Sequence, residues 1–487
     1  MTNTGTDAEK SSAVHRESRS PYELSEAAIV PGEIEIDSLP PCSESCSESS
    51  TPHERQELER DGGYGWITVV CALLCHGLTW GVLTSFGIYL AEYLANDTFP
   101  GTTDLQYAFV LGISLASPLV FTALSNIIIS SKWGGPRVSV YMGCTLYFAG
   151  MFGAAYAKKI WQLYLSQGLA YGIGTGLIFN VAMTVPPKWF FKHRGIAVGI
   201  STAGTGVGGV AFAIGTASMI TNLGIGWSFR ITAIIATTLL VIVGSFLKYP
   251  PEQTHHLFKP FQFDILKKPE YLCTVLYCLL GLMGYMGCVF SIPTFAISGL
   301  GFTRGQGGMG TALFNVGMLF GRPIVGQVLD IVGVINGSLF SGFVTVILAL
   351  AFWATLSTYP QFLVWALLMG SICGSVWTTA APLVAEVVPI KDLGTALSMF
   401  WVLVAPGAVV AMPIALTLRT SDPTRADFRN VAIYCACCYL GSNAALMYTR
   451  WWVVNVRLSE EERLKRLPPK RKWFHFFYGK WYGWIRA

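Results

Sequence analysis

Long, unbroken runs of apolar residues limit most strongly what this chain can fold into. A helix that crosses a bilayer needs about 20 apolar residues, and runs of that kind recur from residue 66 to residue 450. Only 13% of the 487 residues are charged, against roughly 25% in an ordinary soluble domain. The sequence therefore predicts an integral membrane protein and excludes a soluble enzyme, a coiled coil and a disulfide scaffold.

Twelve such runs can be counted, separated mostly by short loops that hold charged residues, proline or glycine. One loop, from Lys248 to Tyr271, is longer and divides the runs into six and six. We therefore expect an all-α fold of twelve transmembrane helices in two pseudo-symmetric six-helix bundles. The runs lie near residues 66–91, 107–130, 138–157, 160–186, 195–217, 231–248, 271–297, 307–328, 334–356, 361–386, 393–417 and 431–450.

The two ends of the chain differ from this apolar body. Residues 1–61 hold 14 of the 28 acidic residues in a Ser-, Pro- and Glu-rich stretch that has too little apolar surface to fold. This stretch has no apolar core, so no cleavable signal peptide is expected. The predicted organisation is a disordered acidic tail over 1–60, a first bundle over 61–248, a central loop over 249–270, a second bundle over 271–450 and a basic tail over 451–487.

Lysine and arginine predict the orientation, because they favour cytoplasmic loops. With the amino terminus inside, the cytoplasmic loops carry ten of them and the outer loops seven, and the segment from Arg450 onward adds ten more inside. We expect a multi-pass protein with both termini in the cytoplasm, in the plasma membrane or alternatively an internal membrane. The sequon at Asn96 then faces outward and is a predicted glycosylation site, whereas the sequon at Asn336 faces inward.

The sequence also limits the partners of the protein. Of its twelve cysteines, two lie in the acidic tail and ten inside apolar runs, which predicts neither a disulfide nor a metal site. No cofactor and no nucleic-acid partner are expected. The predicted partners are a small-molecule substrate, the lipid bilayer and regulatory proteins that bind the acidic tail.

Two short motifs stand at the starts of the first and fifth predicted helices. The second contains Lys192 and Arg194 ahead of a glycine-rich run, and the first is Asp61-Gly62-Gly63-Tyr64-Gly65-Trp66. Asp61 suits the positive end of a helix dipole, and the aromatic residues suit the membrane interface. The glycines of the fifth helix indicate close helix packing. Topology and anchoring explain these motifs, and a role in gating is the alternative.

The paired motifs resemble the signatures of the monocarboxylate transporter family, within the major facilitator superfamily. The resemblance covers roughly residues 60–450 and is closest to the fungal branch, whose cargo is diverse. It implies a secondary transporter, not an enzyme, that moves a small monocarboxylate-like anion or a related small metabolite by alternating access. A third motif, Gly326-x-x-x-Asp330-x-x-Gly333, resembles the superfamily's cytoplasmic loop motif, in which the acid holds neighbouring helices together. Its counterpart after the second helix lacks the acid.

Arg322 is the leading candidate for binding the cargo. It lies about eight residues, or roughly 12 Å along a helix, from Asp330 and thus within the hydrocarbon depth. A guanidinium there can hold a carboxylate through two hydrogen bonds, and the resemblance implies that the arginine of helix 8 is a substrate-site residue. The alternative is a structural arginine that pairs with Asp330 or with a helix carbonyl.

Proton coupling is predicted to be weak. The family resemblance implies symport, but Met318 and Thr84 stand where characterised animal members have an aspartate and a lysine. His76 is the remaining intramembrane group that titrates near neutrality, so it is the coupling candidate. A neutral histidine that bonds a neighbouring helix is the alternative.

Four further residues complete the candidate substrate site. Asn180 aligns with a cavity asparagine of the family, and Trp377, Thr378 and Thr379 could form a polar site with one aromatic wall. Interhelix hydrogen bonding and packing are the alternative for all four. Two other functions stay open: transport of a neutral or larger solute, such as riboflavin or a secondary metabolite, and a nutrient sensor that binds without transporting.

Overall fold

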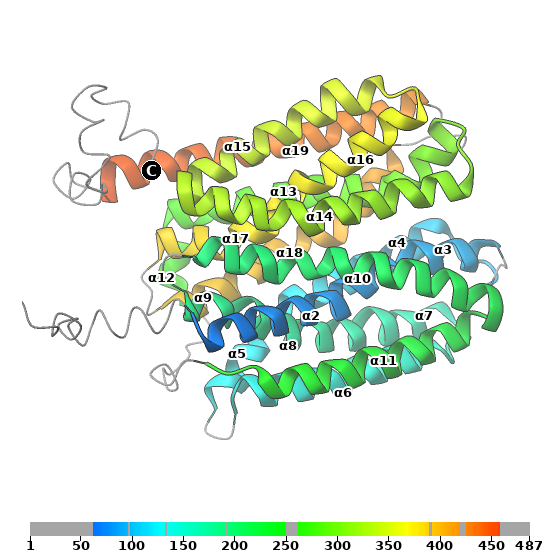
Figure 1. Ribbon diagram of the computed structural model, residues 1–487, viewed down its shortest axis with the longest axis horizontal. Coiled ribbons are helices and arrows are strands. Elements are labelled where there is room, and N and C mark those ends of the chain that lie inside the picture. The colour runs from blue at the N-terminus through cyan, green and yellow to red at the C-terminus, as the bar shows by residue number, and fades with distance from the viewer. Residues whose placement is uncertain are drawn as a thin grey trace, which may run out of the picture. The chain divides into compact units, whose positions relative to one another are not determined.

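The computed structural model describes residues 62–95, 98–131, 134–190, 193–249, 262–388, 392–418 and 425–457. Every regular element in these ranges is a helix (Figure 1). Within the described ranges, eleven helical segments are long and apolar enough to cross a membrane by length and composition. The expected third span, α6, is less apolar than these eleven segments, but it forms a helix of 19 residues at the expected place. The predicted all-α, twelve-helix fold class is confirmed.

The first group of segments precedes the central loop. Several segments consist of two helices in line, because a short break interrupts the hydrogen-bond ladder. The helices are α2 (Tyr64–Thr84), α3 (Phe86–Ala95), α4 (Asp104–Val120), α5 (Thr122–Ser130), α6 (Pro136–Ala154), α7 (Ile160–Leu163), α8 (Tyr171–Thr184), α9 (Pro186–Trp189), α10 (Arg194–Leu223) and α11 (Ile225–Phe246).

The second group follows the central loop and begins with the short helix α12 (Phe263–Leu266). Its helices are α13 (Pro269–Thr294), α14 (Arg304–Val332), α15 (Val334–Ile347), α16 (Tyr359–Cys373), α17 (Ser375–Val387), α18 (Leu393–Thr417) and α19 (Arg425–Trp452). In Figure 1, α2 begins and α19 ends at the same end of the bundles. We refer to that end as the tail face.

Some helices extend beyond the apolar runs. The sixth span begins at Ile225, although its apolar run begins near residue 231, so Arg230 lies inside the helix. The Arg230 guanidinium lies 4.5 Å from the ring centroid of Tyr156 and 4.9 Å from that of Trp227. These cation–π contacts stabilise a charge near the end of a span, and hydropathy alone does not reveal them.

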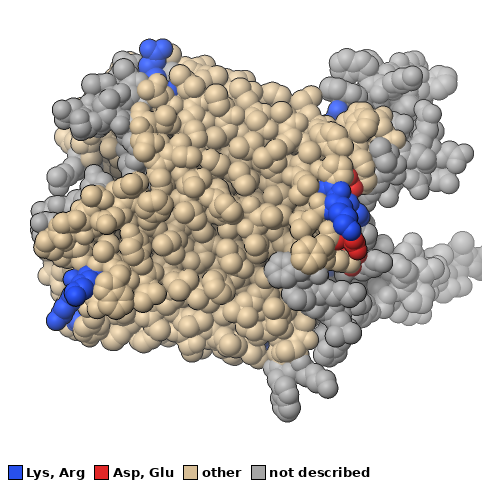
Figure 2. Space-filling model, turned by 180° about the vertical axis from the view of Figure 1, so that it is seen from behind, with Lys and Arg blue, Asp and Glu red and all other residues tan. Residues whose placement is uncertain are grey.

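Apolar side chains cover the middle of the bundles. Figure 2 shows a wide band without charged side chains, with lysine and arginine gathered toward its two ends. Large apolar residues on the outside are strongly exposed, such as Ile214 at 66% and Phe340 at 63%. An apolar belt between two charged rims is the surface that a lipid bilayer covers.

The long helix α10 lies between α2 and α14 (Figure 1). Glycines allow its backbone to approach both neighbours. A Cβ atom on Gly208 would lie 2.0 Å from the Gly77 carbonyl oxygen of α2, and one on Gly199 would lie 2.5 Å from the Arg322 carbonyl oxygen of α14. The glycine-rich run that predicted close packing therefore joins the two groups of helices.

Candidate functional site

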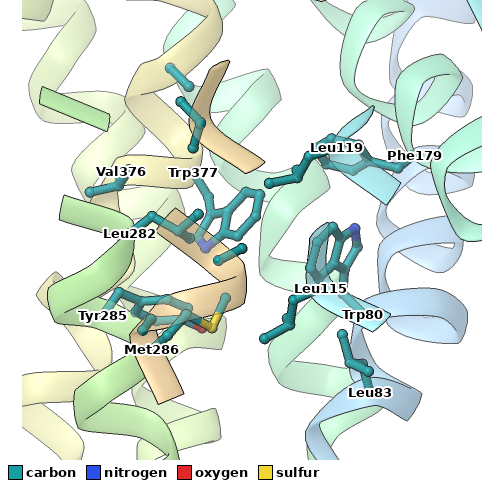
Figure 3. Close-up of a cluster of buried hydrophobic side chains, with 14 of the residues drawn as sticks. Trp80, Leu83, Leu115, Leu119, Phe179, Leu282, Tyr285, Met286, Val376 and Trp377 are labelled. Carbon is teal, nitrogen blue, oxygen red and sulfur yellow. The ribbon is translucent and has the colours of Figure 1, made fainter. Parts of the chain in front are cut away.

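A cavity lies between the two groups of helices. Aromatic and aliphatic side chains form most of its wall, and Figure 3 shows Trp80 and Phe179 from the first group of helices beside Trp377 and Tyr285 from the second. The lining residues are His76, Trp80, Leu83, Thr84, Leu115, Phe179, Thr202, Thr205, Tyr285, Met286, Val289, Phe290, Arg322 and Trp377. Both groups of helices thus contribute, as a site between two moving halves requires.

Arg322 is the charged residue of this lining, and its side chain is 2% exposed. Its Nη1 donates a hydrogen bond to the Thr202 carbonyl of α10, and its Nη2 lies 3.4 Å from the sulfur of Met318. Its Nε has no hydrogen-bond partner among the described residues. No carboxylate in the described ranges pairs with this guanidinium. A buried, unneutralised charge is costly, so an anion that enters the cavity would gain from pairing with it.

The residues around Arg322 leave space for its side chain but are uncharged. The Tyr285 hydroxyl donates to the Met318 sulfur at 3.2 Å, so the group that position 318 presents beside Arg322 is a weak thioether acceptor and not a carboxylate. The tenth span breaks at Gly374, and a Cβ atom there would lie 3.3 Å from both Nε and Nη2 of Arg322. A larger residue at 374 would therefore displace the guanidinium.

His76 and Trp80 line the cavity one helical turn apart on α2. The Nδ1 of His76 lies 2.8 Å from the Ala72 carbonyl oxygen, which belongs to the preceding turn of the same helix. Its Nε2 and the Trp80 Nε1 are buried and have no partner in the part of the chain that the structure describes. The cavity thus presents unpartnered polar atoms from both halves.

An aromatic cluster forms one part of the cavity wall. Trp377 stacks on Trp401 of α18 at 5.6 Å and 21°, and it also contacts Trp80 at 4.8 Å between ring centroids. Phe179 approaches Trp401 edge-on at 5.5 Å. Trp401 is outside the lining, so it supports the cluster from behind. The cavity extends away from the cluster toward Thr84, the last residue of α2 and thus its end far from the tail face.

Three predicted substrate residues lie outside the lining. The Nδ2 of Asn180 donates to Asn126 Oδ1 at 2.8 Å, the Thr378 hydroxyl lies 3.4 Å from that of Thr202, and the Thr379 hydroxyl lies 3.1 Å from that of Tyr277. Consecutive residues of a helix point in different directions, so Trp377 reaches the cavity and its two neighbours do not. These placements fit the alternative of interhelix bonding.

The loop motif after helix 8 joins the halves at the tail face. The Asp330 carboxylate accepts from the backbone N–H of Gly195 at 2.8 Å and of Ile196 at 3.0 Å, at the start of α10. A Cβ atom on Gly326 would lie 2.3 Å from the Gly195 carbonyl, and Gly333 ends α14 with a φ of 102°. Asp330 is therefore engaged with α10 and does not pair with Arg322.

The motif at the start of helix 1 contacts the segment that leads into helix 5. Gly62 and Gly63 form the turn that leads into α2, and Gly65 leaves room for the Phe190 ring, 3.1 Å from where its Cβ atom would be. Trp66 also contacts Phe190, with ring centroids 4.9 Å apart.

Two polar bonds fix the same region. The Tyr64 hydroxyl donates to the Phe246 carbonyl at 2.7 Å, and Arg194 Nε donates to the Pro187 carbonyl at 3.3 Å. Asp61, Lys192 and the predicted glycosylation site Asn96 lie outside the described residues.

Sequence reasoning missed several residues of the site. Trp80, Phe179, Tyr285 and Phe290 line the cavity, and each resembles an ordinary core or lipid-facing residue in an apolar run. The one available signal was the position of Trp80 four residues after His76, on the same face of a helix.

Comparisons with known proteins agree with this architecture. The Major Facilitator Superfamily profile matches residues 69–310 and 298–486. The chain is similar to the "Probable transporter MCH2" of Saccharomyces cerevisiae, with 31% identity over 401 residues that cover 81% of this chain and 84% of that protein. It is also similar to the "Fujikurins efflux protein" of Gibberella fujikuroi, with 28% identity over 360 residues that cover 73% and 76% of the two chains.

Solved structures show the same fold at low identity. The crystal structure of the fucose:proton symporter FucP of E. coli superimposes with a TM-score of 0.59 at 13% identity and covers 78% of this chain and 98% of that one. A structure of FucP in the outward conformation gives a TM-score of 0.56 at 12% identity.

Proposed function

The chain belongs to the Major Facilitator Superfamily of secondary transporters, and we propose that its cargo is a small organic anion with an apolar body. One observation carries this proposal: Arg322 presents a buried guanidinium to the cavity, and no described carboxylate neutralises it. A carboxylate can accept from Nε and restore the charge balance. The aromatic wall supports an apolar body on the same molecule, because pockets of this kind bury most of their ligand.

The two-sided lining supports alternating access. Arg322 crosses from α14 to Thr202 of α10, so the bond that orients the guanidinium also spans the two halves. A cargo that pairs with Arg322 changes the charge at this contact, and a ligand shifts a conformational equilibrium only through such a difference between states. The proposal holds for either direction of transport, and one relative is named an efflux protein.

The test of the proposal uses matched ligands and variants of the purified protein in lipid nanodiscs. We expect 3-phenylpropionate to bind more tightly than 3-phenylpropionamide, which has the same shape without the charge. In Arg322→Gln the carboxylate should bind about 10- to 100-fold more weakly, the range for hydrogen bonds to charged groups. In Arg322→Lys the loss should be smaller, because the charge stays but the planar fork is absent.

Arg230→Gln is the matched control, since Arg230 is also a helical arginine but lies over Tyr156 and Trp227 outside the lining. It should bind both ligands as the unmodified protein does. Normal carboxylate binding by a folded Arg322→Gln protein would refute the anion site and favour a neutral solute. Binding without movement of the labelled acid across liposomes would favour a sensor.

Coupling to protons is proposed to be weak. Thr84 lines the cavity and Met318 lies beside Arg322, and neither side chain is ionisable. We expect an imposed pH gradient to change initial uptake into liposomes little. A strong dependence that is lost in His76→Gln would assign the proton to His76, and one that persists would place the coupling site elsewhere.

We further propose that the tail face is cytoplasmic. Asn336 accepts a hydrogen bond from Arg450 at 2.7 Å near that face, whereas α3 ends at Ala95 on the opposite side (Figure 1). Mass spectrometry of the protein from a glycosylating host should detect no glycan on Asn336. A glycan there would reverse the orientation, and residence in the plasma membrane would be tested separately by surface labelling.

A further inference from the structure

Three buried polar atoms of the cavity lining lack a hydrogen-bond partner among the described residues: Arg322 Nε, Trp80 Nε1 and His76 Nε2. The first two are N–H donors. The third differs, because His76 Nδ1 already faces the Ala72 carbonyl at 2.8 Å. A carbonyl can only accept, so Nδ1 carries the proton, and Nε2 of the neutral ring is an acceptor.

This set of atoms is more specific than an anion site. A carboxylate without other polar groups supplies acceptors for Arg322 and Trp80 but no donor for His76. The side chain of His76 is 3% exposed, and no carboxylate in the described ranges pairs with it. A bound cargo without a donor would therefore leave an imidazole nitrogen buried and unsatisfied, which is unfavourable.

We infer that His76 is a specificity-determining residue whose Nε2 accepts a hydrogen bond from a hydroxyl or N–H group of the cargo. The preferred cargo class is then a carboxylate that carries both an apolar body and a hydrogen-bond donor. This inference rests on the proposed function, because Arg322 must hold the carboxylate for the donor to reach His76.

The aromatic residues around His76 support a bulky body for this cargo. The Phe179 ring lies 5.8 Å from the His76 ring at 82°, and Trp80 lies 5.3 Å from Phe179. These rings fix the plane of the imidazole, and they offer large apolar faces but no further acceptor beside Nε2. A site that is built to bond a donor rejects analogues that lack it, because its own polar atom is left unpaired.

The first experiment changes only the ligand and uses the unmodified protein in nanodiscs at pH 7.5. Isothermal titration compares 3-phenyllactate, its O-methyl ether and 3-phenylpropionate. The three are carboxylates with the same ring, but only the first has a hydroxyl hydrogen to donate. We expect 3-phenyllactate to bind about tenfold more tightly than the other two, as one buried hydrogen bond predicts. Equal binding of 3-phenyllactate and its ether would overturn the inference.

The second experiment changes the protein. His76→Phe should weaken binding of 3-phenyllactate about tenfold and leave 3-phenylpropionate unchanged, so that the preference disappears. His76→Gln should keep part of the preference, because its amide oxygen can accept. His193→Phe is the matched control, since His193 is exposed and lies outside the lining. Thermal unfolding of each variant establishes that it is folded.

The outcomes separate this inference from the proposed function. If no carboxylate binds, or if Arg322→Gln binds all three ligands normally, the anion site itself is refuted. If carboxylates bind through Arg322 but His76→Phe retains the preference for 3-phenyllactate, the anion site stands and the role of His76 is refuted.

Discussion

The two halves of the protein meet along two seams that use different chemistry at the tail face. Where α14 meets α10, the Asp330 carboxylate accepts from two backbone N–H groups. Where α5 meets α18, the neutral side chain of Asn126 donates to the Ser398 hydroxyl and to the Gly394 carbonyl, at 3.4 Å for the latter. The two seams thus differ: one carries a charged contact and the other an amide contact.

The two seams differ in how deeply their polar side chains are buried, and this difference matters more for stability than the charge does. Asp330 is exposed, so water and salt compete with its hydrogen bonds. Asn126 is 7% exposed, and Asn180 at 2% donates to its Oδ1. Loss of Asn126 would remove the acceptor of a buried Asn180 N–H and the donor that Ser398 accepts from, which costs more than loss of a contact that water can replace. We therefore expect the neutral seam to stabilise the joined tail face more than the charged one.

The α10–α14 seam has a second role that the other seam lacks. The Arg322 side chain bonds Thr202 across it, so the cavity and the seam share one residue. The backbones approach closely there, because Gly199 carries no side chain toward α14. Packing at this seam should therefore affect cargo binding as well as stability.

The largest effect is expected for Gly199→Ala. Its Cβ atom would lie 2.5 Å from the Arg322 carbonyl oxygen and 3.1 Å from the Pro323 Cα, so the backbones must separate. We expect a loss of about 2 to 3 kcal/mol of stability, the upper part of the range for overpacking, and weaker carboxylate binding. Thermal unfolding and ligand titration of the purified variant measure both effects.

The control for this variant is Gly308→Ala on α14, where an added Cβ atom would meet nothing within 4 Å. It should keep full binding. Equal stability of the two variants would show that α10 and α14 can move apart at Gly199 without a cost in stability.

A smaller effect, about 2 kcal/mol, is expected for Asn126→Ala, because Asn180 and Ser398 would lose a buried partner. Thermal unfolding in detergent measures it. Asn222→Ala is the matched control, since the exposed Asn222 donates to Ser218 one turn away on its own helix. If both asparagine variants unfold at the same temperature as the unmodified protein, the hydrogen bonds of Asn126 contribute nothing to the stability of the seam.

The fold of this protein could be predicted because its signal is long-range and redundant. Each span requires many apolar residues in succession, so a few polar residues, as in α6, do not hide the pattern. The end of a span is less certain, because single contacts decide it. Arg230 is part of α11 because its guanidinium contacts two aromatic rings: Trp227, one turn earlier in the same helix, and Tyr156, far away in the sequence.

The cavity could be predicted only where a residue is unusual for its depth. Arg322 and His76 are polar residues in the middle of apolar runs, and both line the cavity. Trp377 does so as well, but Asn180 faces Asn126 in another helix, and this direction depends on how the helices are rotated. Tyr285 and Phe290 could not be distinguished from packing residues, because an aromatic side chain in an apolar run has many uses.

The smallest of the three effects is expected for Asp330→Asn, and it tests the comparison most directly. The amide keeps one acceptor for Gly195 or Ile196 but loses the charge at the positive end of α10. We expect a loss of about 1 kcal/mol, typical of a helix cap, which corresponds to roughly fivefold faster amide hydrogen exchange in the first turn of α10.

Salt should distinguish the two seams. Exchange in the first turn of α10 should quicken in the unmodified protein between 0.1 and 1 M KCl, since the screening length falls from about 10 Å to about 3 Å. Amide hydrogen exchange around Ser398 should not change with salt, because the side chains of Asn126 and Asn180 are neutral and buried. If Asp330→Asn instead destabilises the protein more than Asn126→Ala, then charge outweighs burial at the tail face. The α10–α14 contact would in that case be the dominant link between the halves.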